Sequence, residues 1–391
     1  MNEQLLARRI AGVPASFIRE ILKVTEQPGV ISFAGGLPNQ ALFPLEEVRR
    51  AGDAVLRQEG HAALQYSTTE GLQGLREWIS ERYRRRFGLA IPVEEILITN
   101  GSQQALDLLG KALLNPGDPL LMEAPGYLGA IQAFTLYEPG FISVDLREEG
   151  ADLDQLRLRM ARHSPKLFYT VPNFQNPSGI SYSEANRHGV AEILAGRNTL
   201  LIEDDPYGEL RYRGREATSF KQLLPGQTLL LGSFSKTVLP SFRLGWVVAP
   251  PWLMEKLIIA KQSADLHTSG FTQRLLHRYL RDNDFDTHLQ GLIDAYGEQQ
   301  RAMLDAILRH FPPTVRHTRP EGGMFIWASL PHGGSAITLL ERALKQQVAF
   351  VPGHPFYLGR NDSNSLRLNY TNTDVATIER GISRLGTLMA E

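Results

Sequence analysis

A lysine beside small hydroxyl residues lies between two apolar runs of the sequence. The first run, 229–231, is followed by Ser233, Ser235 and Lys236, and Arg243 stands seven residues later, ahead of the second run. A lysine between buried strands loses its proton readily, because desolvation lowers its pKa, and the neutral amine is a nucleophile. Hydroxyls and a guanidinium hold phosphate. The combination predicts a Schiff base between Lys236 and pyridoxal 5'-phosphate (PLP), while the alternative is a lysine that reaches solvent from a loop.

A carboxylate, Asp204, ends another apolar run and must be paired or hydrogen-bonded if it is buried. A protonated pyridine nitrogen would be such a partner and would keep the ring cationic. Tyr207 and the amide of Asn176 could donate hydrogen bonds to the phenolate oxygen of the same ring. Metal binding by Glu203, Asp204 and Asp205 is the competing interpretation. It is disfavoured because adjacent residues of a strand point to opposite faces, and no histidine is near in sequence.

Four further segments could complete a site, and each has a simpler structural explanation. Ser102 and Gln103 precede a helical pattern, where a phosphate can bind, or where a serine merely caps the helix. Tyr127 could lie flat on a pyridine ring or pack in the core. Arg367, on an apolar strand, could clamp a substrate carboxylate or form a structural salt bridge. The glycine pair ending in Gly36 permits close approach of a ligand or forms a turn.

Composition limits the classes of protein that fit this chain. Its 391 residues exceed what one core usually organises, so we expect two domains. Hydrophobic residues make up 42% and the net charge is -1, values of an ordinary globular protein with no broad attraction to nucleic acid or anionic membrane. The absence of cysteine excludes disulfides and thiolate chemistry. The start lacks the apolar core of a signal peptide, and no apolar stretch could span a bilayer, so we expect a cytoplasmic protein.

Strand-like and helix-like segments alternate between residues 96 and 202, which predicts a mostly parallel sheet covered by helices on both faces. Ligands of such sheets bind where the strands end at their carboxyl edge. The polar loops named above follow the predicted strands and should therefore meet there. We expect a turn over 100–104, strands at 96–99, 120–122, 141–144, 167–171 and 199–202, and helices at 105–114, 126–134, 153–162 and 183–194.

The C-terminal part of the sequence has a different pattern of predicted helices and strands. A long helical pattern over 285–310 is expected to connect to a small α+β domain of short strands and helices. A short helix over 14–25 carries Arg19 near the N-terminus. The expected domains are an N-terminal arm with part of the small domain over 1–45, a large domain over 46–290 and the small domain over 291–391.

Three motifs in this order resemble the fold-type I, PLP-dependent aminotransferases (class I/II), and the resemblance covers essentially the whole chain. They are Asn176-Pro-Ser-Gly179, Asp204-Asp-Pro-Tyr207, and Ser233-Phe-Ser-Lys236 with Arg243-Leu-Gly245. The resemblance implies an α/β fold: a large domain with a mostly parallel seven-stranded sheet covered by helices, and a small α+β domain. It also implies a homodimer with shared active sites.

The resemblance assigns a role to each matching position. Lys236 would hold PLP and carry the proton, Asp204 would pair with the ring nitrogen, and Tyr207 and Asn176 would bond the ring hydroxyl. Arg367 would bind the substrate carboxylate, with Asn176 and Gly36 beside it. The remaining cofactor-binding positions are Gly101, Ser102, Gln103, Ser233, Ser235 and Arg243 around the phosphate, Tyr127 on the ring, and Tyr66 reaching the phosphate of the partner subunit.

Further segments resemble the 2-aminoadipate aminotransferase subgroup, which includes relatives of kynurenine aminotransferase. They include Ser32-Phe-Ala-Gly-Gly-Leu-Pro and Ala264-Asp-Leu-His-Thr. Arg19 matches the position that reads a distal substrate carboxylate in that subgroup, whereas Pro206 departs from its more frequent alanine. The resemblance implies ping-pong transfer of an amino group from 2-aminoadipate, an aromatic or an aliphatic amino acid to 2-oxoglutarate.

Two other functions compete with transamination. The first is a β-lyase or decarboxylase on the same scaffold, which would release different products. The second is a non-catalytic metabolite sensor, because related domains are fused to DNA-binding winged helices. We expect no such module here, since the aminotransferase-like region begins almost at the first residue. No metal is expected.

Overall fold

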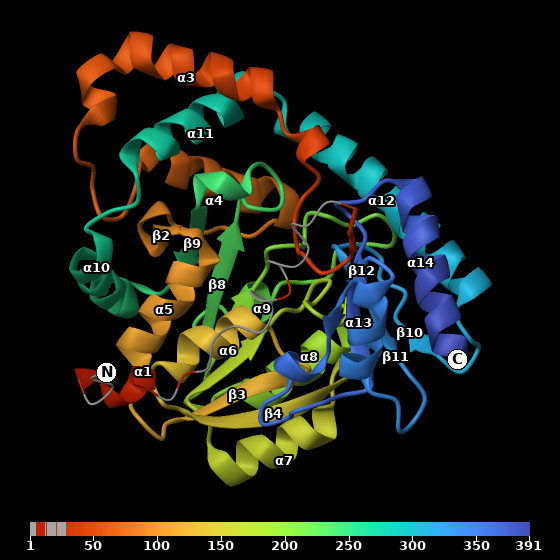
Figure 1. Cartoon of the computed structure of the whole chain (residues 1–391). Helices are drawn as coiled ribbons and strands as arrows, with labels where there is room; N and C mark the ends of the chain where they lie inside the picture. The colour runs from red at the N-terminus through yellow and green to blue at the C-terminus, as the bar shows by residue number, and fades with distance from the viewer. Residues whose placement is uncertain (1–4, 12, 14–20, 22–28) are drawn as a thin grey trace.

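The computed structural model describes residues 5–11, 13, 21 and 29–391, and its centre is one large mixed sheet (Figure 1). Seven strands run in the order β2-β9-β8-β7-β6-β3-β4, and the two-residue β5 folds back on β4 and extends the sheet to eight. Neighbours from β8 to β4 are parallel, whereas β9 runs antiparallel to β8 and β2. The strands are β2 (Ile96–Asn100), β3 (Pro119–Ala124), β4 (Gly140–Arg147), β5 (Gly150–Ala151), β6 (Leu167–Thr170), β7 (Leu200–Asp204), β8 (Thr228–Ser233) and β9 (Leu244–Val248).

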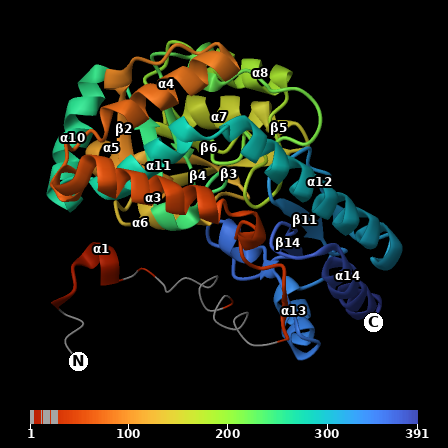
Figure 2. The ribbon, with the colours of Figure 1, turned by 90° about the horizontal axis from the view of Figure 1, so that it is seen from above.

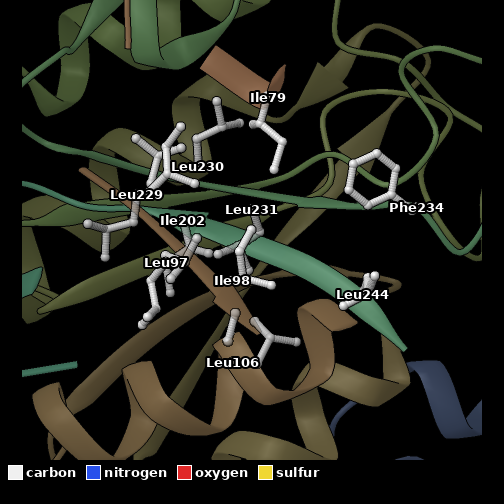
Figure 3. Packing of buried hydrophobic residues seen from close by; sticks show 14 of the residues in the cluster. Ile79, Leu97, Ile98, Leu106, Ile202, Leu229, Leu230, Leu231, Phe234 and Leu244 are labelled. Atoms are coloured by element: carbon white, nitrogen blue, oxygen red, sulfur yellow. The ribbon is translucent and has the colours of Figure 1, made fainter. Parts of the chain in front are cut away.

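Helices cover both faces of this sheet because the central strands are apolar on both sides. Alternate residues such as Met122 and Ile202 share a core cluster with α5 and α6, while Leu121 and Leu201 pack in another cluster with α7 and α8. Figure 3 shows Leu106 of α5 on one side of the strands and Ile79 of α4 on the other. The covering helices are α3 (Leu45–Glu59), α4 (Gln73–Phe87), α5 (Gly101–Leu113), α6 (Leu128–Thr135), α7 (Leu153–His163), α8 (Glu184–Leu194), α9 (Phe220–Leu223), α10 (Pro251–Asp265) and α11 (Gly270–Asp282).

Local sequence signals explain where several helices begin and end. The carboxylate of Asp152 accepts hydrogen bonds from two backbone amides at the start of α7, and the hydroxyl of Ser183 accepts one from the amide of Asn186 in α8. Asp284 caps the long helix α12 (Phe285–His310), whose bounds agree with the predicted ones. Helix α4 ends at its C-terminal side at Gly88, which adopts the left-handed conformation.

A second, smaller sheet lies at the far end of α12 (Figure 2). Its strands run in the order β10-β11-β14-β13 and pair antiparallel. β1 pairs in parallel with β12, so an N-terminal segment joins the C-terminal part of the chain. The predicted division at residues 45 and 290 stays a prediction. The elements are β1 (Ile31–Ser32), β10 (Arg316–His317), β11 (Phe325–Ser329), β12 (Val348–Ala349), β13 (Val351–Pro352), β14 (Ser365–Asn369), α13 (Ala336–Lys345) and α14 (Val375–Ala390).

The N-terminal region is described only in part. A short helix, α1 (Arg8–Ala11), precedes β1. Most of the helix predicted over 14–25, with Arg19, lies outside the described residues. Among the described helices, none has both the length and the apolar character needed to cross a membrane.

The topology brings the predicted loops to one edge of the large sheet. β2, β3, β6, β7 and β8 all run in the same direction, so the segments that follow them leave from the same edge. β9 runs the opposite way, and Arg243 at its beginning therefore lies at that edge too. One expectation was wrong: the segment after Asn100 is not a turn, because α5 begins directly at Gly101.

Candidate active site

A cavity of about 380 Å³ opens at this edge, between the loops of the large sheet and residues of the small sheet. The sequence-predicted residues Gly36, Gly101, Ser102, Gln103, Tyr127, Asn176, Asp204, Tyr207, Ser233, Ser235, Lys236, Arg243 and Arg367 all line it. Residues from every part of the chain therefore meet at one place. One predicted residue, Tyr66, does not line the cavity, and another, Arg19, lies outside the described residues.

Lys236 lies three residues beyond the end of β8 with its amine inside the cavity. Its Nζ donates a hydrogen bond of 2.8 Å to the carbonyl oxygen of Gly36. Burial, and after it the positive charges of Arg367 and Arg243, lower the pKa of this amine to about 8. A substantial fraction of the amine is therefore neutral near physiological pH, which is the nucleophilic form.

Two other buried lysines do not share this environment. Lys261 lies 3.0 Å from a carboxylate oxygen of Asp265, and Lys221 lies 3.7 Å from one of Glu95. In both, the carboxylate opposes the lowering of the pKa by burial. Lys236 instead lies near two cations, whose charges lower its pKa in the same direction as burial does.

Asp204, the last residue of β7, lines the cavity and has one carboxylate oxygen without a hydrogen-bond partner. Its Oδ2 accepts a hydrogen bond of 2.7 Å from the hydroxyl of Tyr169, whereas its Oδ1 is buried without a partner. Burial raises the pKa of Asp204 to about 7, against the hydrogen bond from Tyr169, and the charges of Asp205 and Glu123 raise it further. A cationic ring nitrogen would satisfy the free oxygen and keep the carboxylate ionised.

Alternation along the strand turns Asp204 toward the cavity and leaves Glu203 and Asp205 on the other face, where both lie near Arg187. Glu203 accepts hydrogen bonds from the hydroxyl of Ser219 and from the backbone amide of Lys221. Asp205 accepts from Asn173 and from the amide of Gly208. The competing metal interpretation needed these acids to converge, and within the described residues no cluster of three metal-ligating side chains occurs.

Asn176 and Tyr207 lie together on one wall of the cavity. The Asn176 amide donates a hydrogen bond of 3.3 Å to the Tyr207 hydroxyl oxygen, which leaves the hydroxyl proton free to donate elsewhere. Burial raises the pKa of Tyr207 above its usual range, so the hydroxyl stays a donor. The pair can bind an anionic oxygen on a ligand.

The first turn of α5 forms a cradle with the expected features of a phosphate site. Gly101 has a φ of +70°, and a Cβ on it would lie 2.7 Å from the guanidinium of Arg243. A Cβ on Gly245 would likewise lie 2.7 Å from the backbone nitrogen of Ser102. Close backbone approach, a helix N-terminus and an arginine together favour an anion. Ser233 and Ser235 complete the lining, with the amide of Ser235 donating to the Ser233 hydroxyl.

Gln103 and Tyr127 close the same side of the cavity. The Gln103 side-chain amide donates a hydrogen bond of 2.8 Å to the carbonyl of Gly129, so it ties α5 to α6. A Cβ on Gly129 would lie 2.6 Å from the phenol of Tyr127, so this glycine leaves room for the ring. Burial raises the pKa of Tyr127 to about 12, which keeps the phenol neutral.

Arg367, in the middle of β14, is held on several sides. It donates hydrogen bonds of 2.8 Å to Oδ1 of Asn176 and 2.6 Å to the carbonyl of Ala34. Its guanidinium carbon lies 4.4 Å from the ring centre of Phe325 and 5.2 Å from that of Phe356. Burial lowers its pKa to about 10, and its Nε has no partner. A buried cation with a free donor is suited to bind a carboxylate.

Tyr66 is the described residue among the predicted ones that does not line this cavity. Tyr66 is 79% exposed, and its ring meets the ring of His267 edge-on. Arg19 lies outside the described residues, so its role stays a prediction.

Several lining residues carry no chemical signal in the sequence and were missed. Phe325 and Phe356 read as core residues of the small domain, yet their rings pack against Arg367. Tyr169 is not in the lining but contacts Asp204, which is; it lies within an apolar strand, and only its place two residues before the loop could have pointed to it. The other missed residues are Leu128, Gly129, Gln132, Val171 and Pro206.

The site fits PLP. The free Oδ1 of Asp204, the free Nε of Arg367 and the cradle at Gly101 match a ring nitrogen, a substrate carboxylate and a phosphate respectively. When bound, PLP supplies an electron-withdrawing ring that takes up charge when a bond at the substrate Cα breaks.

Comparison with known proteins agrees with this geometry. Residues 29–385 match the model of the aminotransferase class I and II family. The chain is 45% identical to 2-aminoadipate transaminase of Thermus thermophilus over 96% of its own length and 94% of that protein. It is 41% identical to aromatic-amino-acid aminotransferase 1 of Thermococcus litoralis, with coverage of 100% and 95%.

Solved structures give the same result. A kynurenine aminotransferase of Pyrococcus horikoshii, in complex with PMP and kynurenine, matches with a TM-score of 0.95 and 41% identity, covering 99% of this chain and 97% of that one. An α-aminoadipate aminotransferase of Thermus thermophilus, complexed with N-(5'-phosphopyridoxyl)-L-leucine, matches with a TM-score of 0.92, 43% identity and coverage of 99% and 97%. The chain belongs to the aminotransferase class I and II family, and it is a PLP-dependent aminotransferase.

Proposed function

We propose that this protein transfers the amino group of an L-amino acid to 2-oxoglutarate by a ping-pong mechanism. The observation that carries the proposal is the meeting of Lys236, Asp204 and Arg367 in one cavity, each with a free or reactive polar group. The donor is 2-aminoadipate, an aromatic or an aliphatic amino acid, which are substrate classes that the names of the similar proteins support.

Lys236 and Arg367 are the two residues proposed to act directly on the substrate. Lys236 would hold the cofactor through its neutral amine, and the same amine would carry a proton to and from the substrate Cα. Arg367 binds the α-carboxylate with its free Nε and so fixes the orientation of the Cα toward that amine. Water is excluded on this side by the rings of Phe325 and Phe356.

The other residues hold the cofactor in one orientation. Asp204, whose Oδ1 has no partner, would pair with the ring nitrogen, and Tyr207 and Asn176, which lie together, would donate to the ring oxygen. Tyr127 covers one face of the ring. The phosphate is bound by Gly101, Ser102, Gln103, Ser233, Ser235 and Arg243.

The space for the substrate side chain is lined by a mixture of apolar and polar residues. Leu128, Phe356 and Gly36 offer apolar contacts, and Gln132 offers an amide. Such a lining favours several kinds of side chain over one. A distal carboxylate, as in 2-aminoadipate, would be read by Arg19.

The active unit is a homodimer with shared sites. Tyr66 is exposed at the surface in the single chain, and so are Leu64, two residues before it, and Leu266, the neighbour in sequence of its ring partner His267. An apolar surface around a tyrosine supports a contact with a second copy, in which Tyr66 reaches the phosphate of the partner. A cytoplasmic location and the domain division given above remain parts of the proposal.

A panel of amino donors with 2-oxoglutarate tests this function. We expect glutamate to form with at least one of 2-aminoadipate, an aromatic and an aliphatic donor, and no product to form with Lys236→Ala. Release of pyruvate and ammonia without a new amino acid would instead identify a β-lyase, and carbon dioxide a decarboxylase.

A further inference from the structure

We propose that Tyr169 is a positioning residue for the cofactor, which holds the Asp204 carboxylate ionised with one oxygen turned toward the ring nitrogen. The proposal rests on the function proposed above and extends it to a residue with no role in the motifs of the sequence.

The register of two strands places these residues on one face of the sheet. β6 and β7 are parallel, and Tyr169 pairs with Ile202, two residues before Asp204. Because alternate residues share a face, Tyr169, Ile202 and Asp204 point to the same side. The hydroxyl of Tyr169 reaches Oδ2 of Asp204 at 2.7 Å, and both residues are buried.

The hydrogen bond from Tyr169 makes the two carboxylate oxygens of Asp204 different. Oδ2 is bound to Tyr169, and Oδ1 is left buried without a partner. A buried oxygen without a hydrogen-bond partner costs folding free energy, unless a ligand supplies the missing donor. Since Tyr169 holds the carboxylate by one oxygen, the other is fixed where a ring N–H can meet it.

The same bond opposes the forces that would neutralise Asp204. Burial and the nearby acids Asp205 and Glu123 favour the protonated form, and the hydrogen bond from Tyr169 favours the ionised one. Burial raises the pKa of Tyr169 itself well above its usual range, so the hydroxyl donates at any physiological pH. Tyr127 and Tyr207 also feel the charge of Asp204, and both stay neutral donors because burial raises their pKa values.

Replacement of Tyr169 by phenylalanine removes the hydroxyl and keeps the packing of the ring. The Tyr169 ring packs edge-on against Phe134 at 6.1 Å between centres, a contact that phenylalanine preserves. A matched control exists in Tyr182, which is equally buried and whose hydroxyl donates 2.8 Å to Glu123. Glu123 keeps donors from Thr170, Val171 and Gln175 when that hydroxyl is lost, and it does not line the cavity.

The experiment compares Tyr169→Phe with Tyr182→Phe. We expect Tyr169→Phe to weaken PLP binding by roughly 10- to 100-fold, the range for loss of one hydrogen bond to a charged group. The nitrogen-15 shift of labelled PLP should show a less protonated ring nitrogen in Tyr169→Phe and an unchanged one in Tyr182→Phe. Equal affinity and equal nitrogen shifts in Tyr169→Phe and wild type would overturn the proposal.

Two further measurements separate the possible failures. In the Asp204→Asn background, Tyr169→Phe should change PLP affinity by less than about threefold, because the two residues act through one interaction. If Asp204→Asn binds PLP as tightly as wild type, the role of Asp204 itself is wrong. If Asp204→Asn loses affinity while Tyr169→Phe does not, only the role of Tyr169 is refuted.

A second variant covers the case in which Tyr169→Phe does not fold. A fluorinated tyrosine placed at position 169 keeps the ring and strengthens the donor. It should lower the pKa of the Asp204 carboxyl in the cofactor-free protein, followed by carbon-13 NMR, and an unchanged pKa contradicts the proposal.

Discussion

The guanidinium of Arg367 donates a hydrogen bond of 2.8 Å to Asn176, which links the small sheet to the loop beyond β6 of the large one. The amide of Asn176 in turn donates to the hydroxyl of Tyr207. The group proposed to bind the substrate carboxylate and the groups proposed to bind the ring oxygen are therefore connected by hydrogen bonds. In the proposed function, this connection positions substrate and cofactor relative to each other.

Replacement of Arg367 by lysine tests this connection. Lysine keeps the charge but loses the fork that serves Asn176, Ala34 and the substrate together. We expect kcat/KM to fall by about 10- to 100-fold for every amino donor, since a hydrogen bond to a charged group is lost. Steady-state kinetics measures this change in kcat/KM. The control is Arg274→Lys, at a surface ion pair with Glu59. An unchanged kcat/KM would place the substrate carboxylate elsewhere.

The phosphate cradle is tested by a glycine substitution with a matched partner. Gly101→Ala and Gly117→Ala both place a side chain at positive φ, which costs each variant about 1–2 kcal/mol of stability. Only at position 101 would the new Cβ lie against Arg243, since nothing surrounds position 117 within 4 Å. PLP affinity measured by equilibrium dialysis should fall at least about tenfold in Gly101→Ala alone. Equal affinities in the two variants would contradict the assignment of the cradle.

The capture of PLP by the cofactor-free protein should depend on pH through Lys236. The amine is neutral above its pKa, and the surroundings lower that pKa to about 8. The rate of PLP capture should therefore rise with pH and level off with a midpoint near 8, well below the value of about 10.4 for a free lysine. Stopped-flow absorbance measures this rate, and a midpoint near that of free lysine would show that the amine is not desolvated.

Mixed dimers test the shared site. Tyr66→Phe should weaken PLP binding by roughly 10- to 100-fold, since a hydrogen bond to the phosphate is lost, and Lys236→Ala should abolish covalent attachment. A hybrid of the two variants holds one site with both an intact lysine and an intact Tyr66 from the other chain. Titration of the hybrid with PLP should reveal one tight site per dimer. Hybrids that bind no better than Tyr66→Phe would exclude sharing.

Much of the fold could be predicted from periodicity, because apolar strands and amphipathic helices alternate plainly in the large domain. The direction of β9 could not, since an apolar run reads the same in either orientation and the reversal depends on the short connection that contains Arg243. The start of α5 was missed because Gly101 and Ser102 have weak helix propensity, and tertiary contacts near Arg243 override it.

The candidate site was predicted where residue type and chemistry coincide, as at Lys236 and Asp204. Residues whose function depends on position alone were missed. Tyr169 is a hydroxyl within an apolar strand, and its importance follows from the register of β6 against β7, which the sequence does not reveal. Phe325 and Phe356 look like core residues until the fold places Arg367 beside them.

The most direct test of the account asks which lysine carries the cofactor. The protein loaded with PLP is reduced with borohydride, which makes the bond to the lysine permanent, and its peptides are analysed by mass spectrometry. We predict a phosphopyridoxyl label on Lys236 alone, because Lys221 and Lys261 are held by carboxylates. A label on either of those lysines, or no label on Lys236, would contradict the central claim.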